Sequence, residues 1–289
     1  MQERTKYDTI CHSEGEDMVK KVLIVLSIIT TIIVSILMPI ASWQQIWIPI
    51  VLLIGSFVGY FILYMLFLFI VSLTINDKKE YDKPNKFYRF LLLITMQMLY
   101  DMGGAKVKVT GIEEVPTDKR YMLVFNHRSR FDPIIQTYVL RKNNLVHISK
   151  PSNFKAPIAG KFMKRCGYLS IDRENSKNGL KTILKAIDLI ESGTASVGVS
   201  PEGTRNYQDG LLPFRAGCFK IALKAKCPIV VCTMRNTLDI HKNFPFKKTN
   251  VEMRIIKVIP YEEFKDMNTQ EISEMVRKLM CEDLNIVEE

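Results

Sequence analysis

Residues 22–75 contain no Asp, Glu, Lys, Arg or His, and this charge-free run constrains the fold of the 289-residue chain more than any other feature. A helix needs about 20 apolar residues to cross the ~30 Å hydrocarbon core of a bilayer, so the run is long enough for two helices. It divides at the segment SWQQIW, residues 42–47, which lies between two prolines. Prolines, side-chain amides and tryptophans suit a turn at the membrane interface. We predict a two-helix membrane hairpin with helices at residues 22–41 and 48–73.

The charges at the two ends of the hairpin predict its orientation. Lys20 and Lys21 precede it, five basic residues lie within residues 78–89, and the turn carries no charge. By the positive-inside rule, both ends face the cytoplasm. We therefore expect a protein of the cell membrane whose domain beyond the hairpin faces the cytoplasm. A hairpin that dips into one leaflet fits the sequence equally, whereas a cleaved signal peptide fits less well because a second apolar segment follows directly.

The composition of the chain changes twice after the hairpin. A basic linker leads into an apolar stretch, residues 87–102, for which an amphipathic helix on the membrane surface and a buried core helix are equally good interpretations. We divide the chain into an N-terminal tail (1–21), a hydrophobic two-helix membrane anchor (22–75), a basic linker with an interfacial helix (76–104) and an α/β domain (105–289).

Short β-rich runs alternate with helical runs from residue 105 onward. Strands are predicted at residues 121–125, 145–149, 168–171, 196–199, 228–233 and 251–258. Apolar residues recur at helical spacing at residues 180–190 and 272–280, and Asn268 with Glu271 forms a helix start signal before the second run. This alternation predicts an α/β fold: a mixed, largely parallel sheet flanked by helices and preceded by the membrane hairpin.

The charge balance narrows the class of partner. Lys plus Arg exceeds Asp plus Glu by 40 to 30, so the net charge is +10. A basic surface suits nucleic acid, anionic lipid or a phosphorylated substrate, but the chain has no zinc-finger spacing, basic heptad region or RNA-binding aromatic signature. Lipid is the partner that also fits the hairpin. The six cysteines form no C-x-x-C pair and no zinc-ligand spacing with the histidines, so we expect free thiols in a reducing compartment and no metal or cofactor.

The segment NHRSRFD, residues 126–132, carries the first candidate chemistry. It follows a buried-looking strand, and His127 and Asp132 stand five residues apart across the turn. A carboxylate that holds one imidazole nitrogen protonated leaves the other nitrogen free to take a proton. No Ser or Cys nucleophile accompanies the pair, so the hydroxyl of the substrate is the economical nucleophile. The alternative is a histidine that merely satisfies a helix start.

The segment SPEGTR, residues 200–205, carries the second. Its Pro and Gly favour a turn, its backbone N–H groups and Thr204 suit a phosphate, and Arg205 offers a bidentate fork. Glu202 is placed to steer the guanidinium of Arg205. The alternative is a surface loop with a local ion pair.

Together, these segments resemble the membrane-bound glycerolipid acyltransferases, of the bacterial 1-acylglycerol-3-phosphate acyltransferase type. That family has four ordered blocks, and each has a counterpart here. The counterparts are NHRSRFD at 126–132, KAPIAGKFMKRCGYLSIDR at 155–173, PEGTR at 201–205 and PIV at 228–230, with FRAG at 214–217 between the last two. Ser200, Asn206 and Arg215 depart from the family's usual Phe, Ser and Lys. The resemblance covers roughly residues 106–260.

The resemblance implies a role for each site residue. It implies His127 as general base and Asp132 as the group that orients it. Substrate contacts are implied for Asn126, Lys150, Arg173, Glu202, Gly203, Thr204 and Arg205, with the arginines on the lysophospholipid phosphate. Backbone N–H groups near Gly203 or the Asn126 turn would stabilise the oxyanion. The implied partners are an acyl-CoA or acyl-ACP donor, a lysophospholipid acceptor and membrane lipid, with no nucleic acid.

Other functions fit parts of the pattern. An acyltransferase that uses glycerol 3-phosphate or another lysophospholipid shares the motifs, although the hairpin favours a lipid acceptor. A lipid hydrolase would use His127 to activate water and would need no acceptor. A non-catalytic lipid-binding membrane protein would not need both His127 and Asp132.

Overall fold

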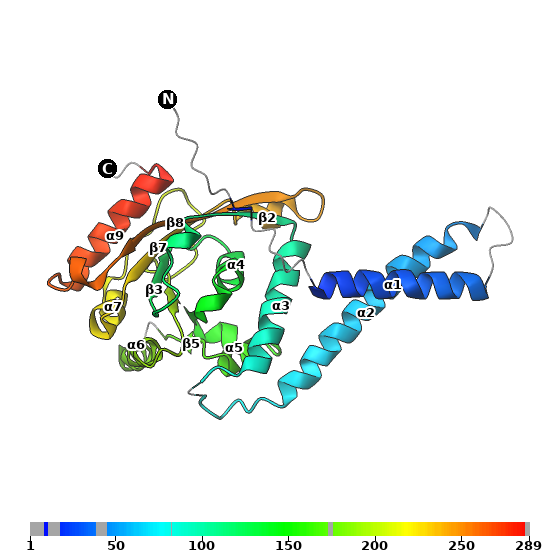
Figure 1. Ribbon diagram of the computed structural model, residues 1–289, viewed down its shortest axis with the longest axis horizontal. Helices are drawn as coiled ribbons and strands as arrows, with labels where there is room; N and C mark the ends of the chain where they lie inside the picture. The colour runs from blue at the N-terminus through cyan, green and yellow to red at the C-terminus, as the bar shows by residue number, and fades with distance from the viewer. Residues whose placement is uncertain (1–8, 11–17, 39–44, 82, 173–175, 287–289) are drawn as a thin grey trace.

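The computed structural model describes residues 9–10, 18–38, 45–81, 83–172 and 176–286 (Figure 1). The α-helices are α1 (Met18–Leu37), α2 (Ile48–Leu73), α3 (Lys86–Met102), α4 (Phe131–Val139), α5 (Ala159–Arg165), α6 (Ser176–Glu191), α7 (Lys220–Ala225), α8 (Asp239–Asn243) and α9 (Thr269–Leu284). The strands are β1 (Thr9–Ile10), β2 (Ala105–Thr110), β3 (Met122–Phe125), β4 (Val146–Ser149), β5 (Leu169–Ser170), β6 (Val197–Val199), β7 (Ile229–Arg235) and β8 (Thr249–Ile259).

The strands form one sheet in the order β1-β2-β8-β7-β3-β6-β4-β5. Strands β7, β3, β6, β4 and β5 run parallel to one another, and β2 runs parallel to β8. The β7–β8 and β1–β2 pairs are antiparallel. The predicted mixed, largely parallel sheet with flanking helices is therefore confirmed. Each of the six predicted strands has its counterpart within a few residues, whereas β1 and β2 were not predicted.

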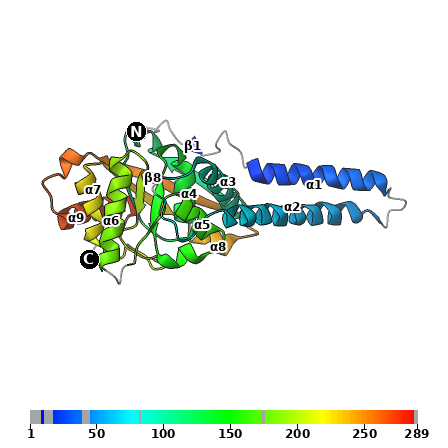
Figure 2. The ribbon, with the colours of Figure 1, turned by 90° about the horizontal axis from the view of Figure 1, so that it is seen from below.

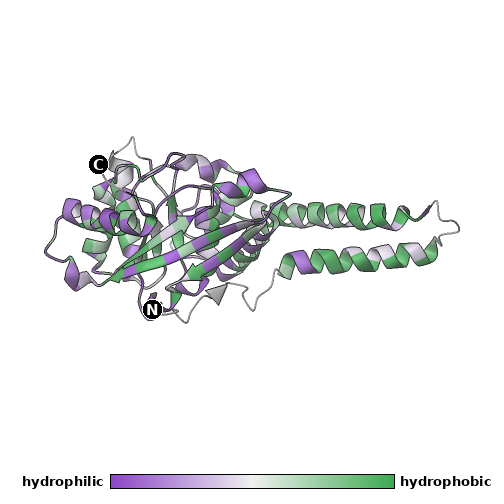
Figure 3. Cartoon of the chain, turned by 90° about the horizontal axis from the view of Figure 1, so that it is seen from above, coloured by the Kyte–Doolittle hydropathy of each residue, from purple (hydrophilic) through white to green (hydrophobic). Residues whose placement is uncertain are grey.

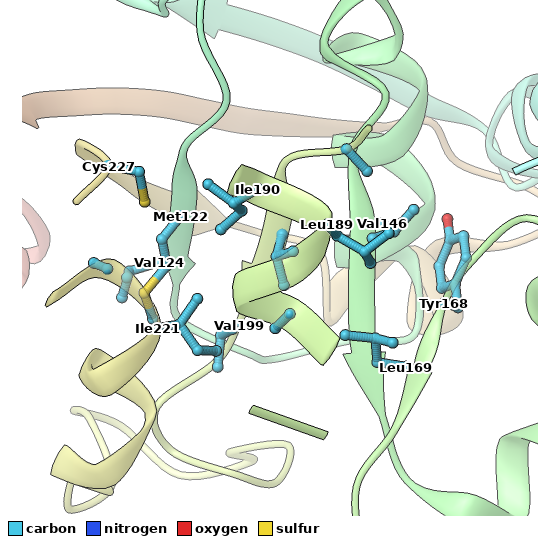
Figure 4. Close-up of a cluster of buried hydrophobic side chains, with 14 of the residues drawn as sticks. Met122, Val124, Val146, Tyr168, Leu169, Leu189, Ile190, Val199, Ile221 and Cys227 are labelled. Carbon is cyan, nitrogen blue, oxygen red and sulfur yellow. The ribbon is translucent and has the colours of Figure 1, made fainter. Parts of the chain in front are cut away.

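The central strand β3 reads MLVF, and all four of its side chains are buried because helices cover both faces of the sheet. Met122 and Val124 point into a core shared with α6, α7 and α9, part of which is drawn in Figure 4. Leu123 and Phe125 point into a second core shared with α4 and α8. The continuous apolar run thus fixes β3 at the centre of the domain. The predicted capping box at Asn268 and Glu271 is present at the start of α9.

The two N-terminal helices form a hairpin that projects from the α/β domain (Figure 2). Both helices are long and apolar enough to cross a membrane, and most of their surface is not covered by protein. Figure 3 shows that both helices consist largely of hydrophobic residues. A helix that is apolar around its whole circumference and is not covered by protein belongs in lipid, so the chain associates with a membrane. The structure starts α1 earlier than predicted, at Met18, and ends it at Leu37.

The hairpin is also continuous with the catalytic core. Leu68 of α2 and Ile75 just after it are each only 3% exposed, and both belong to the core that contains β3. Val19 and Leu23 of α1 pack with Met98 of α3 in a third cluster. The membrane anchor therefore supplies side chains to the folded domain.

Helix α3 resolves the two interpretations of residues 87–102 in favour of a core helix. Leu91, Leu92 and Met96 are buried in the first core, and the guanidinium of Arg89 donates to the carbonyl oxygen of Leu145 at 3.3 Å. The side chain of Asn85 caps the helix by accepting from the backbone amides of Phe87 and Tyr88. An exposed apolar strip remains on the outside, which includes Phe87 and Phe90.

Gly160 provides a test of the packing. A Cβ atom on this residue would lie 2.3 Å from the backbone oxygen of Phe154, which cannot rotate away. We expect Gly160→Ala to lower the free energy of unfolding by about 1–3 kcal/mol through overpacking. The measurement is thermal unfolding of the purified protein in detergent. Gly179→Ala in α6 is the matched control, since its Cβ meets nothing closer than 3.9 Å. An equal melting temperature for the two variants would contradict the prediction.

Candidate active site

The site lies where parallel strands end at the same edge of the sheet. The strands β3 and β6 are parallel neighbours, with Val124 opposite Val199. The segment that carries His127 follows β3, and the segment that carries Glu202 follows β6. Because the carboxyl ends of parallel strands meet at one edge, two segments 75 residues apart in sequence come into contact. The two candidate motifs of the sequence therefore form a single site.

The carboxylate of Asp132 organises the turn after β3. One of its oxygens accepts from Nδ1 of His127 at 2.9 Å and from the backbone amides of Arg128 and Ser129 at 2.7 Å each. Asp132 is fully buried in the first turn of α4, where the helix dipole favours a negative charge. Three donors therefore meet at one oxygen of this carboxylate and fix its position in the turn. The hydroxyl of Ser129 also accepts from the amide of Phe131, at 3.3 Å, and so caps the helix start.

Only 23% of the His127 side chain is exposed. Its Nδ1 is fixed by Asp132, so this nitrogen carries the proton and Nε2 is the basic nitrogen. Beneath it, the rings of Phe125 and His127 meet edge to face, with centroids 6.0 Å apart. The imidazole is thus held on one side by a carboxylate and on the other by an aromatic ring.

Glu202 joins the two motifs through the backbone. One of its oxygens accepts from the amide of His127 at 2.8 Å, and the other accepts from the amide of Leu212 at 3.0 Å. The sequence suggested that Glu202 steers Arg205, but both carboxylate oxygens are engaged by backbone donors instead. Burial raises the pKa of Glu202, and the two N–H donors only partly offset that effect. The amide of Asn206 completes the link by donating to the carbonyl oxygen of His127 at 2.7 Å.

Asn126 ties the site to a third strand. Its amide nitrogen donates to the carbonyl oxygen of Met234 at 3.0 Å, and its amide oxygen accepts from the Met234 amide at 2.7 Å. Met234 lies in β7, on the other side of β3 from Glu202. The side chain is buried and both of its polar atoms are used, so Asn126 braces the end of β3 rather than facing a substrate.

The polar residues expected to bind substrate surround this core. Gly203 turns the chain with a positive φ of 74°, and its amide donates to Ser200. Thr204 is exposed, and the guanidinium of the half-buried Arg205 lies over the ring of Tyr207, 5.4 Å from its centroid. Lys150 is exposed directly after β4 at the same edge, although it makes no contact with His127 or Asp132 among the described residues. Arg173 lies outside the described residues.

Two features of the site were not predicted from the sequence. Arg128 reaches across to the other motif and donates to the carbonyl oxygen of Gln208 at 2.6 Å. His147 of β4 is fully buried beside Phe125, with ring centroids 5.4 Å apart, and burial lowers its pKa to about 3. His147 is therefore neutral and adds no positive charge beside His127. No local sequence signal marks either contact, since each depends on the order of the strands.

Comparisons with known proteins agree with this geometry. A family model described as "Acyltransferase" matches residues 106–235. The 1-acyl-sn-glycerol-3-phosphate acyltransferase alpha of Ovis aries is 28% identical over 218 residues, which cover 75% of each chain. The 1-acyl-sn-glycerol-3-phosphate acyltransferase of Saccharomyces cerevisiae is 31% identical and covers 63% of this chain and 61% of its own length. A bacterial relative from Streptococcus pneumoniae with the same name is 24% identical over 74% of this chain and 78% of its own.

A solved structure has the same fold. The 1-acyl-sn-glycerophosphate (LPA) acyltransferase PlsC from Thermotoga maritima superposes with a TM-score of 0.56, covering 92% of this chain and 96% of the other at 16% identity. The family match spans both motifs of the site, from before β3 to the end of β7. Residues 106–235 therefore match the acyltransferase family, and this matched part of the chain contains both motifs of the site.

Proposed function

We propose that this enzyme transfers a fatty acyl group from acyl-CoA or acyl-ACP to the free sn-2 hydroxyl of lysophosphatidic acid, giving phosphatidic acid. The observation that carries the proposal is the His127–Asp132 pair, hydrogen-bonded at 2.9 Å and linked through Glu202 to the PEGTR turn. The names of the relatives from animals, yeast and bacteria support this acceptor. The hairpin supports a substrate and a product that are membrane lipids, and its flanking charges support a site on the cytoplasmic side.

The geometry supports a direct transfer. Nε2 of His127 takes the proton from the sn-2 hydroxyl as its oxygen attacks the carbonyl carbon of the thioester. The tetrahedral intermediate then collapses, and the thiolate leaves with the proton from the imidazolium. Asp132 keeps the ring in the productive tautomer and stabilises the imidazolium. Holding both substrates at one site supplies the rest of the acceleration by proximity.

The oxyanion of that intermediate needs N–H donors. The amides of His127, Arg128 and Ser129 are engaged by carboxylates, and that of Gly203 by a carbonyl. The amides of Thr204 and Arg205 bond to no group in the part of the chain that the structure describes, and they lie next to Asn206, which contacts His127. We assign the oxyanion to these two amides.

We assign the acceptor phosphate to Arg205, whose planar fork suits two phosphate oxygens, and to Lys150 at the same edge of the sheet. The family resemblance adds Arg173 as a further supporting charge. Thr204, being exposed in the PEGTR turn, adds a hydroxyl donor. Glycerol 3-phosphate or another lysophospholipid would present a similar phosphate, and is the second acceptor class that these residues fit.

An acceptor panel tests the proposal. Purified protein with radiolabelled acyl-CoA should form phosphatidic acid from lysophosphatidic acid, with little product from glycerol 3-phosphate or other lysophospholipids. His127→Ala should lower that rate at least ~100-fold, because a positioned base contributes that much or more. Asp132→Asn should also be severe. Fatty acid released without any acceptor would identify a hydrolase instead, and a His127→Ala rate within tenfold of the parent would refute the base assignment.

Glu202 should act by positioning His127. Glu202→Gln keeps one acceptor oxygen but sets an NH₂ group against a backbone N–H, and an unsatisfied buried donor costs about 1–3 kcal/mol. We expect kcat to fall to about one-tenth of the parent value or below, while the KM values for donor and acceptor stay nearly unchanged. Glu262→Gln, at an exposed glutamate, is the control. A selective rise in the acceptor KM would instead mean that Glu202 contacts the substrate.

Arg205 should act on the acceptor. Charge-assisted hydrogen bonds of about 1.5–3 kcal/mol each correspond to roughly 10- to 150-fold in affinity. Arg205→Ala should therefore raise the acceptor KM within that range, and Arg205→Lys should raise it less, because lysine keeps the charge but loses the fork. Kinetics with each substrate varied in turn measure this. A raised donor KM with an unchanged acceptor KM would move Arg205 to the phosphates of coenzyme A.

A further inference from the structure

The segment from the last turn of α8 to the start of β8 carries an unusual combination of side chains. It reads HKNFPFKK from His241 to Lys248 and contains no acidic residue. Phe246 is 97% exposed, and Phe244 is 55% exposed. Lys242, Lys247 and Lys248 are exposed around them. A phenyl ring held fully in water is unfavourable, so the segment calls for a partner that is apolar at its centre and negatively charged at its rim.

The segment is held in place at its base. The amide of Phe244 donates to Ile240 at 3.0 Å, and that of Lys247 donates to Asn243 at 2.8 Å. The side chain of Asn243 donates to the hydroxyl of Thr249 at 2.9 Å, and the Thr249 amide donates to Gly104 at 2.9 Å. These bonds anchor the tip to α8, β8 and the turn after α3. The phenylalanines are therefore displayed by a built structure.

Its position indicates what the partner is. In Figures 1 and 2 this orange segment projects from the side of the domain from which the hairpin leaves. The same segment leads back to the site, since the ring of His241 packs on Phe131 with centroids 5.3 Å apart, and Phe131 precedes Asp132. The face of the domain next to both the hairpin and the catalytic turn is the face directed toward the membrane.

We propose that residues 241–248 form a second membrane contact, which we call the aromatic loop. Phe244 and Phe246 enter the interfacial layer of the bilayer, and Lys247 and Lys248 bind anionic head groups, whereas Lys242 is paired with Asp239 at 3.2 Å. Aromatic side chains favour the interface, and each lysine near an anionic surface contributes about fivefold in association. The hairpin alone fixes one point of attachment. The aromatic loop adds another, which sets the tilt of the domain and keeps the catalytic turn at the head-group level.

Photo-crosslinking in the full-length protein tests this contact directly. Phe246 is replaced by the photoreactive p-benzoylphenylalanine, and the protein is reconstituted into vesicles of equal parts phosphatidylcholine and phosphatidylglycerol. Illumination should give lipid adducts at residue 246, detected by mass spectrometry. Lys265, which is exposed near the start of α9 at the opposite end of the domain, carries the same replacement as a control and should give none above background. Equal yields at the two positions, or adducts between two protein chains at residue 246, would overturn the proposal.

The lysines are tested in the same system. The preference for phosphatidylglycerol over phosphatidylcholine adducts should fall several-fold in Lys247→Gln/Lys248→Gln. The matched pair Lys220→Gln/Lys224→Gln, exposed on α7, should leave it unchanged. If the preference for phosphatidylglycerol adducts persists in Lys247→Gln/Lys248→Gln, these lysines do not bind anionic head groups. This readout is independent of the acyl acceptor, so it stands or falls separately from the proposed reaction.

Discussion

One buried carboxylate holds the site together. Asp132 accepts from an imidazole and from two backbone amides through a single oxygen, at 2.9, 2.7 and 2.7 Å. These bonds shape the turn after β3 and fix the orientation of the His127 ring. A carboxylate buried in this way is tolerated only because charge-assisted bonds and a helix N-terminus compensate for its lost hydration. The geometry of the turn and the orientation of the His127 ring therefore have the same cause.

The neighbouring strands extend this arrangement across the sheet. Glu202, after β6, holds the amide of His127, and Asn126 holds the end of β7. The turn that bears the base is thus braced from both sides of β3. Only the parallel order of these strands brings the braces together, and the antiparallel β8 lies outside the site. The arrangement of the site thus depends on the carboxyl ends of β7, β3 and β6 lying side by side.

The sequence predicted the parts of the molecule that are encoded locally. Apolar runs marked β3, β6 and β7, and the charge-free run marked the hairpin, because burial and lipid each demand an uninterrupted pattern. The strand β2 was not predicted, although AKVKVT alternates apolar and polar residues with the period of a half-buried strand. The His127–Asp132 pair is close in sequence and was foreseen. The contacts of Glu202, Arg128 and Asn126 span 75 to 108 residues and depend on strand order, which no local pattern contains.

The burial of Leu68 and Ile75 in the catalytic core has a consequence for how this protein is made. The last turns of α2 are both the end of the anchor and a wall of the domain's hydrophobic core, because Leu68 packs into that core. A ribosome delivers the hairpin first, so insertion into the bilayer positions that wall before the sheet has been synthesised. A truncated chain that begins after residue 75 would lack Leu68 and expose the apolar surface beneath it, which favours aggregation. Soluble expression of the isolated domain would need a replacement for this wall, whereas biogenesis at the membrane provides it from the outset.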